Sequence, residues 1–225
     1  MILIKTNKYS FISSISFIFC ALLFSCTSNE PIILPAYKRP LDTPINQATK
    51  LIEVRPVTLD LPEGHKLGKI GMGVLCLPMT DLITIGGKAP VSEGDFTNEV
   101  VNVLEKANYN LVNSNSNNMK SSRSEVELIL KGVVKDLKAD ICFPSSGFRG
   151  WKIGKGESYI KIDWNLISKQ TNQTIFETTT EGSYKLKDTV AYGPKKVILG
   201  SVTVATHNLI ADENLVKLVI TSNKH

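Results

Sequence analysis

The stretch Glu157-Ser-Tyr-Ile-Lys-Ile-Asp-Trp-Asn-Leu-Ile167 alternates apolar and polar side chains along its length. Side chains two residues apart in a β-strand lie on the same face of the sheet. One face of this stretch therefore collects large apolar groups: Ile160, Ile162, Trp164 and Leu166. The other face collects groups that tolerate water: Tyr159, Lys161, Asp163 and Asn165. The pattern predicts an antiparallel strand with one face on a hydrophobic core.

The segments on either side of this stretch continue the sheet. Residues 168–172 are typical of a turn, and residues 173–184 return as a strand rich in Thr and aromatic residues. Residues 126–141 precede the stretch as one long strand, or as two strands joined by a bend near Asp136. Residues 185–194 are expected to form a connection. The second half of the chain is therefore predicted to be a β-meander.

Shorter strands are predicted in the first half of the chain. Residues 51–61 alternate in part, and residues 69–77 alternate apolar side chains with glycines. Residues 78–90 are expected to be a loop that contains a short strand at 82–85. A further strand is expected at 109–112.

Two longer helices interrupt these strands. Ser92 and Asp95 are both suited to begin the first helix, and Asn108 is suited to end it. Residues 195–211 carry an apolar stripe at helical spacing, and Asp212 is suited to begin a last short helix. The order of elements predicts an α+β fold: a mostly antiparallel sheet with two main helices packed on one face.

The amino-terminal residues have the organisation of a secretory signal. Lys5 and Lys8 precede the apolar run 11–24, and a small residue and a cysteine close it. The sequence Leu23-Phe24-Ser25-Cys26 resembles the lipobox of bacterial lipoproteins. The resemblance implies that residues 1–25 are removed and that Cys26, acylated on its thiol, becomes the new amino terminus. Thr27, in a position where Asp favours the inner membrane in that family, then favours the outer membrane.

Two other interpretations of the signal are open. An uncleaved transmembrane helix would need about 20 mainly apolar residues, and the run 11–24 is shorter and contains serines. An ordinary cleaved signal would release a soluble periplasmic or secreted protein. With lipidation, the chain divides into a signal peptide (1–25), a lipidated Cys26 followed by a proline-rich tether (26–50), and a periplasmic α+β domain (51–225).

Two families resemble the predicted domain. The order of elements over residues 66–220 resembles a small periplasmic domain. That domain is shared by the amino-terminal domain of the Tol-system translocation protein, the curli-secretion lipoprotein and the activator lipoproteins of penicillin-binding proteins. Residues 155–182, with Trp164 and the run Thr178-Thr179-Thr180, resemble a module found ahead of trypsin-like serine protease domains. That second resemblance would make the chain a stand-alone accessory module, with no catalytic residue to carry over.

The net charge and the cysteines limit the kinds of partner and the cellular compartment that we expect. The formal net charge of +5 falls to +3 when Lys5 and Lys8 leave with the signal, an excess too small and scattered to indicate nucleic-acid binding. Cys76 and Cys142 remain in the mature domain. In an oxidising compartment they either form a disulfide or stay as two separate buried thiols, and the sequence leaves both alternatives open.

The residues needed for the common enzyme mechanisms are missing from the mature chain. Its histidines are His65, His207 and His225, and no Gly-x-Ser-x-Gly motif accompanies them. We interpret His207 as a packed or solvent-edge residue of a helix. No short-spaced set of metal ligands and no phosphate-binding loop occurs, so no catalytic residue, metal or cofactor is expected.

A glycine-rich loop between two predicted strands holds Phe148, Arg149, Trp151 and Lys152. An aromatic side chain beside arginine is typical of a binding hot spot, so these four residues are candidates for partner binding. Trp151 alternatively folds back to cap the core.

Together these features predict a lipid-anchored, non-enzymatic scaffold or accessory factor that binds another envelope protein. An auxiliary subunit of an export or lipid-trafficking system is the alternative, and the oligomeric state stays open.

Overall fold

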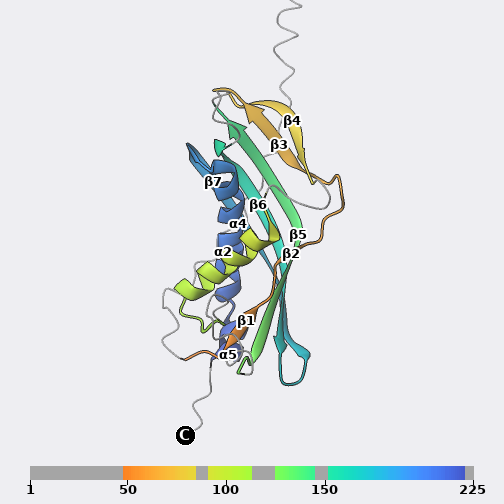
Figure 1. Ribbon diagram of the computed structural model, residues 1–225, viewed down its shortest axis with the longest axis vertical. Coiled ribbons are helices and arrows are strands. Elements are labelled where there is room, and N and C mark those ends of the chain that lie inside the picture. Colours follow the sequence, from red (N-terminus) through yellow and green to blue (C-terminus); the bar gives the residue numbers. More distant parts are fainter. Residues whose placement is uncertain (1–47, 85–90, 113–124, 145–151, 221–225) are drawn as a thin grey trace, which may run out of the picture. The chain divides into compact units, whose positions relative to one another are not determined.

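The computed structural model describes residues 48–84, 91–112, 125–144 and 152–220 (Figure 1). These residues form an α+β unit, as predicted, and within them the structure has one seven-stranded sheet and three helices. Cys26, residues 1–47 and the loop residues Phe148, Arg149 and Trp151 lie outside the described part of the chain.

The meander predicted in the second half is present. Strands β5 (Leu128–Phe143), β6 (Ile153–Ser168) and β7 (Gln173–Ala191) pair antiparallel in that order. The register of β5 against β6 shifts between Val134 and Asp136, at the bend predicted near Asp136. The expected connection at 185–194 was wrong for most of its length, because β7 continues to Ala191. Residues Ile153 to Gly156 extend β6 and supply backbone partners for this end of β7.

The sheet is mixed, and the prediction that it is mostly antiparallel was wrong. Strands β1 (Ile52–Val54), β2 (Thr58–Leu59) and β3 (Lys66–Met72) all run parallel to β5. Parallel neighbours need a long crossover, usually a helix. Helix α2 (Glu93–Lys106) lies in the chain between these strands and β5 and provides that crossover.

The strand predicted at 51–61 is divided in two. Arg55 N donates to Leu130 O on β5 (2.9 Å), whereas Val57 N donates to Thr97 Oγ1 on α2 (2.9 Å). Pro56, between them, has no N–H to offer. The predicted strand at 109–112 is reduced to a single bridge between Leu111 and Ile52.

The loop expected at 78–90 was wrong for residues 78–83, which belong to a strand, and residues 85–90 lie outside the described part of the chain. Strand β4 (Leu77–Ile83) pairs antiparallel with β3 and lies at the edge of the sheet, next to β3 in the order β4-β3-β5-β6-β7. Apolar residues on its solvent side break the alternation that a half-buried strand shows, so the sequence pattern did not reveal it.

Helix α2 begins where predicted, and both candidate capping residues take part. Asp95 N donates to Ser92 Oγ and Ser92 N donates to Asp95 Oδ2, each at 3.2 Å, which forms a capping box. Asn108 follows the helix with φ +63°. Helix α5 (Glu213–Val219) begins at Asp212, whose Oδ1 accepts from Asn214 N (2.9 Å).

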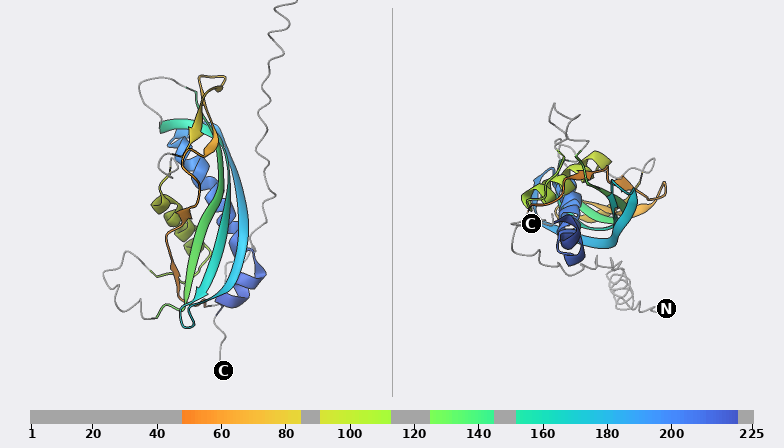
Figure 2. Two further views of the ribbon diagram at one scale, coloured as in Figure 1. Left: turned by 90° about the vertical axis from the view of Figure 1, so that its right-hand side faces the viewer. Right: turned by 90° about the horizontal axis from the view of Figure 1, so that it is seen from below.

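Helix α4 (Gly193–Ile210) packs on β6 and β7, and α2 packs against α4 (Figure 2). Gly182 of β7 allows the close approach, because a Cβ there would lie 2.1 Å from Ser201 O of α4. Gly200 of α4 makes room for the ring of Tyr184 in the same way. The apolar stripe predicted for β6 forms the buried side of this layer, with Ile160, Ile162, Trp164 and Leu166 all at most 1% exposed.

Candidate functional site

A disulfide between Cys76 and Cys142 joins the β3–β4 turn to the end of β5. The two Cα atoms are 5.4 Å apart, and 66 positions separate the residues in the sequence. Of the two alternatives left open by the sequence, the structure has the bridge. Cys142 pairs with Gly71 of β3 on one side and with Lys155 of β6 on the other, so the bridge is attached to the interior of the sheet.

Hydrogen bonds hold the same turn in place. Gly73 N donates to Phe143 O (3.0 Å), and Cys76 N donates to Gly73 O (3.0 Å). Gly73 and Cys76 have φ of +74° and +52°, left-handed values that let the chain reverse within four residues. The turn is therefore fixed to β5 by a covalent bond and a backbone hydrogen bond.

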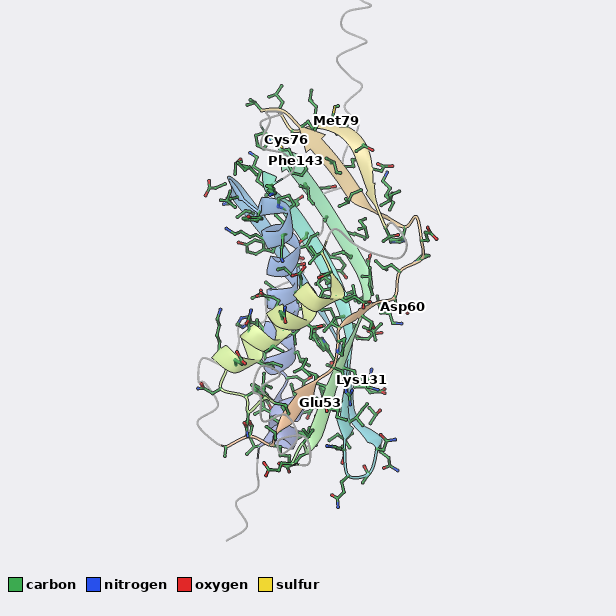
Figure 3. The ribbon with its side chains drawn as sticks, viewed as in Figure 1. Glu53, Asp60, Cys76, Met79, Lys131 and Phe143 are labelled. Atoms are coloured by element: carbon green, nitrogen blue, oxygen red, sulfur yellow. A yellow bond between two sulfur atoms is a disulfide. The ribbon has the colours of Figure 1, made fainter. Side chains whose placement is uncertain are left out.

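This turn and the start of β4 carry four exposed apolar side chains, which we call the apolar tip: Val74, Leu75, Leu77 and Met79. They are 85%, 80%, 60% and 65% exposed. Figure 3 shows Met79 beside Cys76 and Phe143 at one end of the sheet, and Glu53 and Lys131 towards the other. Single exposed apolar residues are common on protein surfaces, but a cluster of them on one rigid turn indicates a contact surface.

The edge strand beside the tip is poorly suited to pairing with another strand. Pro78 lacks an N–H, and the β3–β4 register shifts twice. Lys66 Nζ also lies 2.8 Å from Asp81 Oδ1, which places an ion pair on the edge hairpin. Proline, irregular register and charge are the features by which natural edge strands avoid sheet extension. The tip therefore offers side chains for contact, not a backbone edge.

A second surface feature is a hollow of about 480 Å³ between α2, α4 and β7. Its lining mixes charged, polar and apolar groups, among them Glu99, Tyr184, Leu199, Thr203, Val204 and His207. Thr203 Oγ1 donates to Glu99 Oε1 (2.6 Å), which ties α4 to α2 across the hollow. We call this surface the helical hollow.

His207 lies in the helical hollow on α4 and is half-buried. Burial lowers the pKa of its imidazole, Lys106 lowers it further, and Glu99 partly opposes them. The other described histidine, His65, follows the turn before β3, and its backbone N donates to Thr84 Oγ1 (2.9 Å).

Of the four residues predicted as a binding hot spot, only Lys152 lies in the described part of the chain. This lysine is exposed at the start of β6, and its carbonyl accepts a hydrogen bond from Tyr192 N. Sequence reasoning missed the apolar tip, because the strand predicted at 69–77 ends at Met72 and residues 73–76 form a turn. The useful signal was Gly73 followed by two apolar residues before a cysteine, a combination that places apolar groups in a turn.

Within the described ranges, no helix is long and apolar enough to cross a membrane. In the same ranges, no group of three or more His, Cys, Asp or Glu side chains is placed to hold a metal ion.

Comparison with known proteins yields distant likenesses only. No family model matches the chain, and no curated protein matches it. Protein XCC0632 from Xanthomonas campestris is 12% identical, with a TM-score of 0.43, and the match covers 79% of this chain and 91% of that one. The PelC dodecamer from Paraburkholderia phytofirmans is 11% identical, with a TM-score of 0.36, and the match covers 84% and 96% of the two chains.

Lipoprotein GNA1162 from Neisseria meningitidis is 11% identical, with a TM-score of 0.32 and coverage of 72% and 98%. Likenesses this distant assign neither a family nor a function to this chain. The resemblances to the Tol-system, curli-secretion and penicillin-binding-protein activator domains, and to the protease-associated module, stay predictions.

Proposed function

We propose that the chain is a lipid-anchored accessory protein of the bacterial envelope that binds another envelope protein and catalyses no reaction. The observation that carries this proposal is the Cys76–Cys142 disulfide. Disulfides persist in exported proteins and are rare in the reducing cytosol. The bridge therefore supports export by the predicted signal, which lipid attachment at Cys26 requires.

The start of the domain, at Thr49 and Lys50, is a suitable attachment point for a tether. Lys50 N donates to Val219 O (2.8 Å), and Thr49 forms a bridge with Ile220. Residues 27–47, which would connect this point to Cys26, span at most about 70 Å when fully extended. An acylated Cys26 would thus keep the domain near a membrane while leaving it room to meet a partner.

The helical hollow is the face that we assign to the partner protein. Its walls are held by two contacts between α2 and α4, Thr203 with Glu99 and Lys195 Nζ with Asp95 Oδ1, both at 2.6 Å. A fixed concavity that combines charges of both signs with apolar side chains suits the polar and apolar groups of a protein surface. Its lining includes the charged side chains of Glu99 and Lys196, which suit a protein partner better than the acyl chain that a lipid-carrying subunit would bind.

A test combines lipid analysis with crosslinking. Mass spectrometry of the mature protein should find an amino-terminal acylated Cys26. A photoreactive phenylalanine in place of Val204, in the helical hollow, should crosslink one envelope protein in native membranes, and the same probe in place of Lys217 on α5 should not. Unmodified Cys26 would refute the anchor, and equal, unselective crosslinks from both positions would refute the binding face.

A further inference from the structure

We propose that the apolar tip is a second membrane contact, which inserts Val74, Leu75, Leu77 and Met79 into an anionic phospholipid surface. This contact lies outside the helical hollow. It requires only that the domain is exported, and it does not depend on acylation of Cys26.

The tip is built to project and to stay rigid. Val74 and Leu75 lie in the turn after Met72, which pairs with Phe143 at the end of β5, and Leu77 and Met79 lie at the start of β4, where Leu77 pairs with Met72. The disulfide and the Gly73–Phe143 hydrogen bond prevent the turn from folding back over the sheet. A membrane contact benefits from this rigidity, because apolar groups already held outside the fold need no rearrangement before they insert.

The side chains of the tip fit lipid better than a protein partner. Hot spots of protein interfaces are rich in Trp, Tyr and Arg, and Leu and Val are under-represented in them. The tip holds only aliphatic and thioether side chains, and all four are exposed. Since Pro78 and the irregular β3–β4 register disfavour strand addition, the remaining use of these side chains is burial in an apolar medium.

The groups around this end of the sheet match a membrane–water interface. Lys155 lies directly across from Cys142, so its side chain shares a face of the sheet with the disulfide. Lys152 and Lys187 are exposed at the neighbouring ends of β6 and β7. Asp188 is exposed there too and offsets part of this charge. The ammonium groups of the three lysines can reach lipid phosphates while their methylene groups stay beside the acyl chains of the lipid.

Tyr192 adds an aromatic residue to the lysines at this end of the sheet. It is exposed immediately after β7, and its N–H donates to Lys152 O, which fixes it at the same end of the sheet. Tyrosine is enriched in membrane-interface belts because its ring is apolar and its hydroxyl is polar.

The tether is long enough for both contacts to reach one bilayer. The tether enters the domain beside β1, which pairs with the first residues of β5, whereas the tip lies at the end of the sheet that holds the last residues of β5. The 16 residues of β5 span about 50 Å. Residues 27–47 extend to at most about 70 Å. The domain can therefore turn its tip towards the membrane that holds Cys26.

The test uses the full-length protein in its native envelope. A photoreactive phenylalanine replaces Leu75 in one variant and Ile175 in a control. Ile175 is also an exposed apolar residue, but it lies at the β6–β7 end of the sheet where the tether enters. After irradiation, mass spectrometry measures lipid and protein adducts at each position. We expect about tenfold more lipid adduct at Leu75 than at Ile175.

A companion variant carries Leu77→Asp and Met79→Asp together with the probe at Leu75. Both substituted residues are exposed, so the melting temperature should be unchanged, and the lipid adduct should fall about tenfold. Equal lipid adduct at Leu75 and Ile175, or adducts at Leu75 to protein instead of lipid, would overturn the inference. Lipid adducts at Leu75 in a protein with unmodified Cys26 would support the membrane contact while refuting the anchor.

Discussion

The indole Nε1 of Trp164 donates a hydrogen bond to Thr180 Oγ1 at 2.7 Å, and that hydroxyl donates in turn to Ala205 O at 2.8 Å. These two bonds connect β6, β7 and α4 inside the core. A Thr180→Val substitution keeps the shape of the side chain but leaves the indole N–H without its acceptor. We expect a loss of about 1–3 kcal/mol in the free energy of unfolding, measured by urea denaturation.

The adjacent residue provides the control for this prediction. Thr179 Oγ1 donates to Asp163 Oδ1 (2.6 Å), but on the exposed face of the sheet. Thr179→Val should change stability by less than about 0.5 kcal/mol. Equal losses in the two variants would mean that burial of the hydrogen bond is not the cause.

Removal of the disulfide should destabilise the fold without changing its architecture. The closed loop spans 66 positions, and in the chain-entropy model such a bridge is worth about 4 kcal/mol. The Cys76→Ser/Cys142→Ser variant should lose an amount of this order in chemical denaturation. Reduction of the wild-type protein should reproduce that loss and should add nothing in the variant. A wild-type stability that does not respond to reductant would contradict the prediction.

Alanine substitutions at Gly182 and Gly94 should have different effects on the free energy of unfolding. A Cβ on Gly182 would lie 2.1 Å from Ser201 O and 2.5 Å from Ala205 N, so α4 would have to move away from β7. We expect Gly182→Ala to cost about 1–3 kcal/mol. A Cβ on Gly94, in the first turn of α2, meets only Ser92 Oγ at 3.8 Å, so Gly94→Ala should be neutral or stabilise by up to about 1 kcal/mol. Thermal unfolding of both variants tests the pair, and destabilisation of both would argue against this packing.

The carboxylate of Asp95 should make the fold sensitive to acid. Its hydrogen bond with Lys195 (2.6 Å), followed by those with Ser92, lowers the pKa of Asp95 below its ordinary value of 3.8. A carboxyl group whose pKa is lower in the folded protein stabilises the fold above the unfolded-state pKa. That stability is lost as the pH falls through the folded-state pKa. Asp95→Asn should therefore reduce the pH dependence of stability below pH 4.

Two lysine variants check the origin of that effect. Lys195→Gln should weaken the same pH dependence, because it removes the main cause of the lowered pKa. Lys217→Gln should leave it unchanged, because the pair of Lys217 with Glu213, 3.9 Å apart on the surface of α5, is exposed on both sides. If the free energy of unfolding of the Lys195→Gln variant depends on pH below pH 4 in the same way as that of the wild type, the ion pair does not cause the sensitivity to acid.

Several features of the fold could be predicted from neighbouring residues alone. The apolar stripe of β6, the capping residues Ser92, Asp95 and Asp212, and the left-handed Asn108 all appear where the sequence placed them. Each depends on interactions within a few positions of the chain, where side-chain spacing and capping chemistry act directly.

The parallel pairing of β1, β2 and β3 with β5, and the edge strand β4, could not be predicted in this way. Their partners lie far along the chain, and which strands meet depends on how the connecting segments fold back over the sheet. The continuation of β7 to Ala191 has the same origin, because its partner residues belong to another strand.

The amino-acid order alone was sufficient to predict an α+β composition and two cysteines able to pair, and it also predicts an export signal, since these depend on residue type and local spacing. Folding in three dimensions decided that Cys76 meets Cys142 and that four apolar residues, on the β3–β4 turn and the start of β4, remain outside the core. The reason is physical: exposure and disulfide geometry are set by distances between strands, and no local pattern of side chains encodes those distances.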